Sequence, residues 1–73
     1  MKISQEEADR LLYVAAMDVK MNPCLRFGQA LWNILPPSAV DTTWGTELDF
    51  FYWKDKQKVL ETFYLHYVEV YHA

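Results

Sequence analysis

Two proline-containing breaks, Asn22-Pro23 and Pro36-Pro37, constrain the fold of this chain more than any other feature of its sequence. A proline disfavours helical geometry in the residue before it and cannot donate a helical hydrogen bond, so neither break fits inside a regular helix. On both sides of the first break, and before the second, apolar residues recur with the spacing of amphipathic helices. The sequence therefore predicts an all-α protein whose helices end or begin at the prolines.

The first helix is predicted to span residues 5–21. Ser4, followed three residues later by Glu7, forms a capping box, in which the hydroxyl accepts from a first-turn amide and the carboxylate reaches back to the cap. Glu6 and Arg10 lie one turn apart and are expected to form a supporting ion pair. The apolar face consists of Ala8, Leu11, Leu12, Ala15, Ala16 and Val19.

The second helix is expected after a tight turn, with Pro23 as its first residue and Asn22 as its cap. It ends at the Pro36-Pro37 pair. Gly28 lies inside this helix at a cost of about 1 kcal/mol relative to alanine, which predicts that another part of the chain approaches it closely. The apolar side consists of Phe27, Ala30, Leu31, Ile34 and Leu35.

The third helix is predicted to begin at Lys56, with Asp55 as its cap, and to end near Tyr71. The β-branched and aromatic content of residues 63–71 is also compatible with a strand. A helix is favoured because alternation of apolar and polar residues is absent and residues 56–62 have a helical pattern. The apolar stripe consists of Val59, Leu60, Phe63, Tyr67 and Val70.

Residues 36–54 are expected to form an ordered loop, with a short helical turn near residues 47–51 as the most regular part. Loops of this length tend to be either functional or disordered. Packing of this loop onto the helices is predicted by its aromatic residues, which are Trp44, Phe50, Phe51, Tyr52 and Trp53. Residues 1–73 are thus expected to form a single small domain of three helices, with the long aromatic-rich loop between the second and third.

Apolar burial must stabilise such a domain, because Cys24 is the only cysteine and no intramolecular disulfide can form. The chain is 52% hydrophobic and 16% aromatic, a composition that excludes disorder. A single cysteine and the lack of a secretory signal at the first residues predict a cytoplasmic location.

The charges and the lengths of the apolar runs argue against two classes of partner. Ten acidic and seven basic residues give a net charge of −3, and the basic residues are scattered along the sequence, so no nucleic-acid partner is expected. No stretch approaches the roughly 18 consecutive apolar residues that a membrane span requires, so no membrane partner is expected either.

The sequence contains no recognisable catalytic or metal-binding pattern. His66 and His72 are six residues apart, a spacing that does not place them on adjacent turns of one helix face, so no metal site is predicted. Cys24 has no histidine base in its vicinity and is expected to be a buried free cysteine. Gly28 and Gly45 are too few for a phosphate-binding loop. We therefore expect no enzymatic activity and no cofactor.

A group of polar side chains on the second helix is the strongest candidate for a binding site. Arg26, Gln29 and Asn33 are spaced to project from one side of the helix, and an arginine fork can hold a carboxylate or carbonyl oxygens. In a structural interpretation, which we favour, Arg26 fastens the long loop by pairing with Asp49 or by holding carbonyls near Gly45. In a functional interpretation the same group recognises a partner's acidic or main-chain groups, framed by the aromatic residues Trp32, Trp44 and Tyr52.

Two sets of apolar residues outside the main stripes are candidate interfaces. On the first helix, Tyr13, Met17 and Met21 lie next to Val14, and either they contact a partner or the aromatic loop covers them. If both sets are exposed, association into a two-fold dimer is expected. The set on the third helix consists of Tyr64, Leu65, Val68 and Tyr71.

Two motifs stand in order along the chain. The first is R-x-G-Q-x-x-x-N-x-L, formed by Arg26, Gly28, Gln29, Asn33 and Leu35. The second is G-T-x-x-D-x-F-Y, formed by Gly45, Thr46, Asp49, Phe51 and Tyr52. Together they resemble a pattern found in small uncharacterised proteins of bacteria and their phages. The resemblance covers about residues 22–55, although Phe50 and Trp53-Lys54 stand where a proline and an acidic pair often flank the Phe-Tyr. It implies a compact, mainly helical, cytoplasmic protein of phage or prophage origin, and it supplies no reaction.

Together these features predict a non-enzymatic module that binds another protein and, if the phage association holds, inhibits or modulates a host protein. Two other functions stay open. One is a small-molecule or nucleotide binder that uses stacked aromatic side chains and Arg26. The other is a structural subunit that associates with itself.

Overall fold

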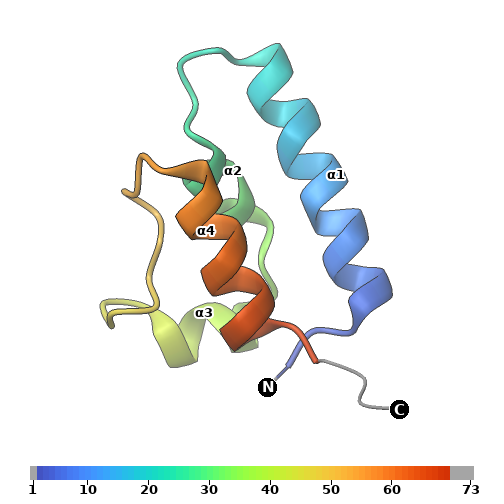
Figure 1. Cartoon of the computed structure of the whole chain (residues 1–73), viewed down its shortest axis with the longest axis vertical. Coiled ribbons are helices and arrows are strands. Elements are labelled where there is room, and N and C mark those ends of the chain that lie inside the picture. The colour runs from blue at the N-terminus through green and yellow to red at the C-terminus, as the bar shows by residue number, and fades with distance from the viewer. Residues whose placement is uncertain (1, 70–73) are drawn as a thin grey trace.

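The computed structural model describes residues 2–69, which form four α-helices and one short π-helical turn (Figure 1). The prediction of an all-α fold is confirmed, but the expected number of three helices is wrong for this part of the chain, because a further helix lies within the expected loop. In chain order the elements are α1 (Gln5–Met21), α2 (Phe27–Ile34), α3 (Pro37–Thr43), α4 (Lys56–Thr62) and the π-turn η1 (Phe63–Tyr67).

Helix α1 has the predicted bounds, and its N-terminus is capped as expected. The Ser4 hydroxyl accepts a hydrogen bond from the Glu7 amide over 3.2 Å. The Glu7 carboxylate pairs with Arg10 instead of returning to the cap, so the expected Glu6–Arg10 pair is replaced by one that is three residues apart. Packing of α1 against α2 buries one side of the helix through Ala8, Leu11 and Ala15.

Helix α2 is shorter than predicted because residues 22–26 form a turn instead of its first turn. Asn22 ends α1 rather than capping α2, since its side-chain amide donates to the Asp18 carbonyl over 3.2 Å. Arg26 precedes the helix in an extended conformation, with φ −78° and ψ 149°. At the other end Leu35 is also extended, as expected for a residue before a proline.

The region expected to be a loop contains helix α3. Pro37 occupies the first turn of this helix, where a missing amide hydrogen has no consequence and the fixed φ is already helical. The second proline of the pair therefore begins one helix while the first separates it from α2. Thr43 is buried in the last turn, and its hydroxyl donates to the Ala39 carbonyl over 2.7 Å.

Helix α4 begins as predicted, but it ends at Thr62 and is followed by η1. The Asp55 carboxylate accepts from the amides of Gln57 and Lys58, at 3.0 and 3.3 Å. After η1 the chain becomes extended at Val68, which forms an isolated parallel bridge with Ile3. Two hydrogen bonds hold this bridge, from the Ile3 amide to the Tyr67 carbonyl (2.8 Å) and from the Glu69 amide to the Ile3 carbonyl (2.7 Å). The predicted end of the third helix lies outside the described residues.

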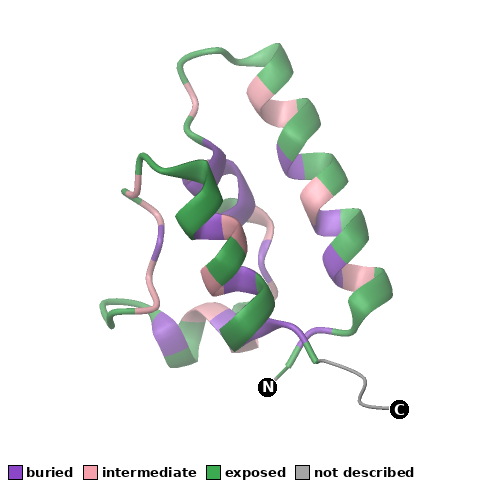
Figure 2. Ribbon diagram, viewed as in Figure 1, coloured by how far each residue is buried: buried purple, intermediate pink, exposed green. Residues whose placement is uncertain are grey.

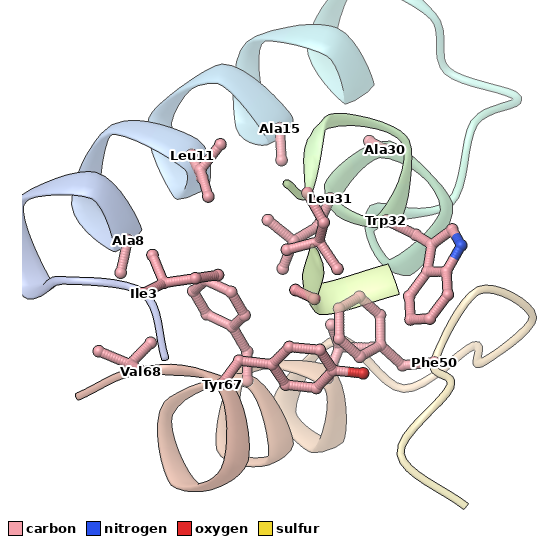
Figure 3. Close-up of a cluster of buried hydrophobic side chains, with 14 of the residues drawn as sticks. Ile3, Ala8, Leu11, Ala15, Ala30, Leu31, Trp32, Phe50, Tyr67 and Val68 are labelled. Atoms are coloured by element: carbon pink, nitrogen blue, oxygen red, sulfur yellow. The ribbon is translucent and has the colours of Figure 1, made fainter. Parts of the chain in front are cut away.

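The core fills the space between α1, α2, η1 and the loop, and each of these contributes buried residues (Figure 2). Phe50 is fully buried and connects the loop to two helical elements (Figure 3). Its ring meets Trp32 of α2 edge-on and also Tyr67 of η1, both at a centroid distance of 5.4 Å. The Tyr67 hydroxyl donates to the Leu48 carbonyl over 2.6 Å. The predicted packing of the aromatic loop onto the helices is thereby confirmed.

Gly28 is the point of close approach that the sequence predicted. A Cβ atom at this position would lie 2.5 Å from the Phe50 carbonyl oxygen and 3.3 Å from a methyl group of Val59. Only a glycine therefore allows the loop to lie directly against α2 while α4 packs beside it.

Candidate functional site

Arg26 contacts the long loop, but not through the predicted partner. Its guanidinium donates to the Tyr52 carbonyl over 3.4 Å, a long hydrogen bond. Asp49 stabilises the loop itself, accepting from the amides of Gly45 (3.0 Å) and Phe51 (3.1 Å). Within residues 2–69 no ion pair joins Arg26 to Asp49.

The remaining members of the predicted polar group lie on the same side of α2 as Arg26 but make no hydrogen bond there. Gln29 is half-buried and Asn33 is exposed, and neither side chain has a hydrogen bond among the described residues. The three residues therefore share a side of the helix without forming a network. The three aromatic residues expected to frame this group are not in similar environments. Trp32 is buried against Phe50, whereas Trp44 and Tyr52 are 75% and 77% exposed.

The apolar set on α1 is not covered by the loop. Tyr13 is 69% exposed, Met21 75% and Met17 39%, and Val14 beside them is also exposed. The loop packs instead against α2 and η1, on the other side of the molecule's core (Figure 2). A continuous apolar stripe therefore runs along the solvent side of α1. We call Tyr13, Val14, Met17 and Met21 the α1 stripe.

The second apolar set is only partly exposed. Val68, which was expected on the surface, is 1% exposed because it pairs with Ile3 and turns into the core. Tyr64 is 38% exposed, and burial, followed by the charge of Asp9 and a hydrogen bond with that carboxylate, raises the pKa of its phenol. Tyr64 therefore contacts α1. Leu65 is 68% exposed, and Tyr71 lies outside the described residues.

Cys24 is exposed, so the prediction of a buried free cysteine is wrong. The reason is that α2 begins at Phe27, four residues later than expected, which leaves Cys24 in the turn between α1 and α2. His66 is exposed as well, and no group of three potential metal ligands occurs in residues 2–69. His72 lies outside that range. None of the helices described is long and apolar enough to cross a membrane.

The structure brings together basic residues that are scattered in the sequence. Lys54, Lys56 and Lys58 surround the start of α4, where Arg26 also lies because it reaches Tyr52. The Lys56 ammonium lies 4.9 Å from the centroid of the Phe27 ring, next to Arg26 in sequence. Four of the seven basic residues thus share one region. The alternating lysines are visible in the sequence, but the arrival of Arg26 beside them depends on the tertiary contact.

The described residues enclose no pocket. Comparison with known proteins finds no matching family model, no matching curated protein and no matching solved structure.

Proposed function

We propose that this protein is a non-enzymatic module that binds another protein through the α1 stripe. The observation that carries the proposal is the exposure of Tyr13, Met17 and Met21 at successive turns of one helix. Methionine and tyrosine are enriched at protein interfaces because they present large, adaptable apolar surface. Burial of such an exposed apolar surface against a partner is favourable in free energy.

The α1 stripe is held rigidly, which favours binding. The opposite side of α1 is buried in the core through Ala8, Leu11 and Ala15, and both ends of the helix are capped, by Ser4 and Asn22. A partner therefore meets a helix that is already ordered, and little conformational entropy is lost on association.

The resemblance to small phage proteins extends this proposal to the kind of partner. In that case the partner is a protein of the bacterial host, and the module acts in the cytoplasm by covering the partner's surface. No reaction by the module itself is needed for such an effect.

Charge insertion into the α1 stripe tests the proposal. Met17→Glu places a carboxylate in the middle of the stripe, whereas Ala16→Glu introduces the same charge at an exposed position of the same helix but outside the stripe. Each variant is used as bait in a bacterial lysate, with circular dichroism to verify folding. We expect a specific protein that the wild type and Ala16→Glu both retain and that Met17→Glu loses. Capture of no protein, or equal capture by both variants, would contradict the proposal.

Self-association is the second candidate function, and the geometry of the stripe supports it. In an antiparallel pair of α1 helices centred on Met17, Tyr13 of one copy lies opposite Met21 of the other, because both are four residues from the centre. Sedimentation over a range of concentrations distinguishes this function. A dimer in the wild type that becomes a monomer in Met17→Glu would replace the foreign partner with a second copy.

Binding of a small molecule or nucleotide is the third candidate function. It would use the exposed ring of Tyr52 for stacking and the Arg26 guanidinium for an anionic group. Thermal unfolding in the presence of individual nucleotides tests it, and an upward shift of the melting temperature that Arg26→Gln abolishes would support it.

A further inference from the structure

The start of α4 carries a surface whose chemistry differs from that of the α1 stripe. Arg26, Lys54, Lys56 and Lys58 are all exposed there, and we call these four residues the cationic patch. The residues are connected by contacts: Arg26 donates to the Tyr52 carbonyl, two residues before Lys54, and Lys56 lies over Phe27, the neighbour of Arg26. These contacts bring Arg26 and Lys56 together from two segments of the chain.

Aromatic rings support the positive groups of the patch. The Lys56 ammonium lies 4.9 Å from the centroid of Phe27, and the Lys58 ammonium lies 4.8 Å from that of Trp53. Contacts of this kind restrain lysine side chains that would otherwise be free in solvent. Tyr52, whose carbonyl accepts from Arg26, is 77% exposed, which adds an exposed aromatic side chain to the charged surface.

Three of the ten acidic residues lie away from the cationic patch. The N-terminal part of α1 carries Glu6, Glu7 and Asp9. It lies beside the end of η1, because Ile3 pairs with Val68 there, and so at the opposite end of α4 from the patch (Figure 1). The carboxylate in the patch, Asp55, points its Oδ1 atom at two backbone amides of α4. The cationic patch is thus a positive region on a molecule whose net charge is −3.

Most of the hydrogen-bonding capacity at Arg26 is unused inside the described chain. A guanidinium has five N–H groups, and only the long bond to the Tyr52 carbonyl engages one of them. An arginine fork in this state can take a carboxylate with two parallel hydrogen bonds. The neighbouring ammonium groups can hold further carboxylates along an extended segment.

We propose that the cationic patch binds an acidic segment of a partner protein, in which carboxylates alternate with an aromatic or apolar side chain that rests on Tyr52. This inference goes beyond the function proposed for the α1 stripe, since it concerns a separate surface and names the chemistry of its occupant. Complementary charge recruits the segment, and the Tyr52 ring selects for an apolar residue within it.

A short acidic peptide fits this surface better than a nucleic acid does. The patch has four cations and includes the carboxylate of Asp55, and a nucleic acid that extends beyond it meets the carboxylates of the rest of the chain. Stable non-specific binding of a polyanion rests on many phosphate contacts, each of which releases a counterion. A segment with a few carboxylates and one ring matches the extent of the patch.

The proposal is tested by fluorescence anisotropy with a labelled peptide in which Glu and Asp alternate with Phe, against the same peptide with Gln and Asn in place of the acids. We expect the acidic peptide to bind and the neutral one not to bind. Loss of one exposed ion pair weakens binding by up to roughly fivefold. Because Lys54→Glu also adds repulsion, it should weaken binding of the acidic peptide at least roughly fivefold. Lys2→Glu changes the net charge equally at an exposed position outside the patch and should leave Kd unchanged.

Asp55→Asn supplies a test in which binding improves. Asparagine caps helices about as well as aspartate, so the start of α4 is retained while a negative charge leaves the patch. Binding of the acidic peptide should become roughly twofold to fivefold tighter. This variant keeps the proposal testable even where loss of binding in another variant reflects a change of fold.

Two results would overturn the inference. The first is equal binding of the acidic and neutral peptides. The second is tighter binding of single-stranded oligothymidylate than of the peptide, with the same dependence on Lys54 and Asp55, which would assign the patch to nucleic acid. Neither result touches the α1 stripe, and Met17→Glu should leave peptide binding unchanged, so failure of this inference is distinguishable from failure of the proposed function.

Discussion

Replacing Gly28 with alanine tests the contact on which the loop's position depends. In an isolated helix this change is stabilising by about 1 kcal/mol, because alanine is the better helix former. Here the added Cβ would lie 2.5 Å from the Phe50 carbonyl oxygen, whereas real Cβ atoms essentially never come within 3.0 Å of another heavy atom. The loop and α2 must therefore move apart.

The blocking atom belongs to the backbone, and it cannot turn away freely because the Trp53 amide donates to it over 3.1 Å. Overpacking costs about 1–3 kcal/mol, and a rigid obstacle places Gly28→Ala near the upper end of that range. After the gain of about 1 kcal/mol in helix propensity, the net loss is about 2 kcal/mol. In a domain of this size the melting temperature then falls by roughly 8–16 °C.

Urea unfolding followed by circular dichroism measures the change, with Asn33→Ala as the control. Asn33 is exposed on the same helix, so alanine there should leave stability unchanged or slightly increase it. A Gly28→Ala protein that is as stable as the wild type would refute the reasoning, because the loop could then not lie where Phe50 meets α2.

Two further predictions concern the buried tyrosine of η1. Tyr67→Phe leaves the Leu48 carbonyl without its partner, so urea unfolding should show a loss of about 1–2 kcal/mol, while Tyr52→Phe at an exposed position should show none. Burial raises the pKa of Tyr67, and burial with the nearby Asp9 carboxylate raises that of Tyr64. Since the folded state favours the protonated phenols, their contribution to stability is complete below a pH of about 10 and is lost as the pH rises through the folded-state pKa values. Unfolding in alkaline buffers should therefore show a steeper loss for the wild type than for Tyr67→Phe, and equal slopes would contradict this.

Local signals in the sequence are sufficient to predict where two helices start and where another part of the chain approaches α2 closely. Ser4 and Asp55 have side chains that accept first-turn amides, and such capping depends only on residues within one turn. Gly28 was recognisable because a glycine inside a helix is unfavourable unless something needs the space. These features are predictable since each has a physical cause within a few residues or in a single unusual residue.

The errors arise where two local interpretations compete and tertiary contacts decide between them. Pro37 is compatible with the end of one helix and with the start of another, and the structure uses it as a start. The continuation of α4 into η1 is a second case. The helical segment formed by α4 and η1 ends where Val68 pairs with Ile3, a residue from the other end of the chain. No pattern near Val68 could have indicated that pairing.

Of the two candidate sites, one was predictable from the sequence and the other was not. The α1 stripe was predictable because helical spacing alone places Tyr13, Met17 and Met21 on one side, away from the main apolar face. The cationic patch was not, since Arg26 joins the lysines only after the loop has packed against α2. A count of basic residues along the sequence therefore described them as scattered.

The dependence of the patch on this packing leads to a last prediction. The loop lies close to α2 because Gly28 has no side chain, and the same contact brings Tyr52 within reach of Arg26. In Gly28→Ala the loop must move away, so the acidic peptide should bind more weakly even at temperatures where the variant is fully folded. Ala16→Gly is the matched control, because it lowers stability by about 1 kcal/mol at an exposed position of α1 without a change in the loop. Anisotropy titrations of both variants would contradict this link between loop packing and the patch if Gly28→Ala bound the peptide as tightly as Ala16→Gly.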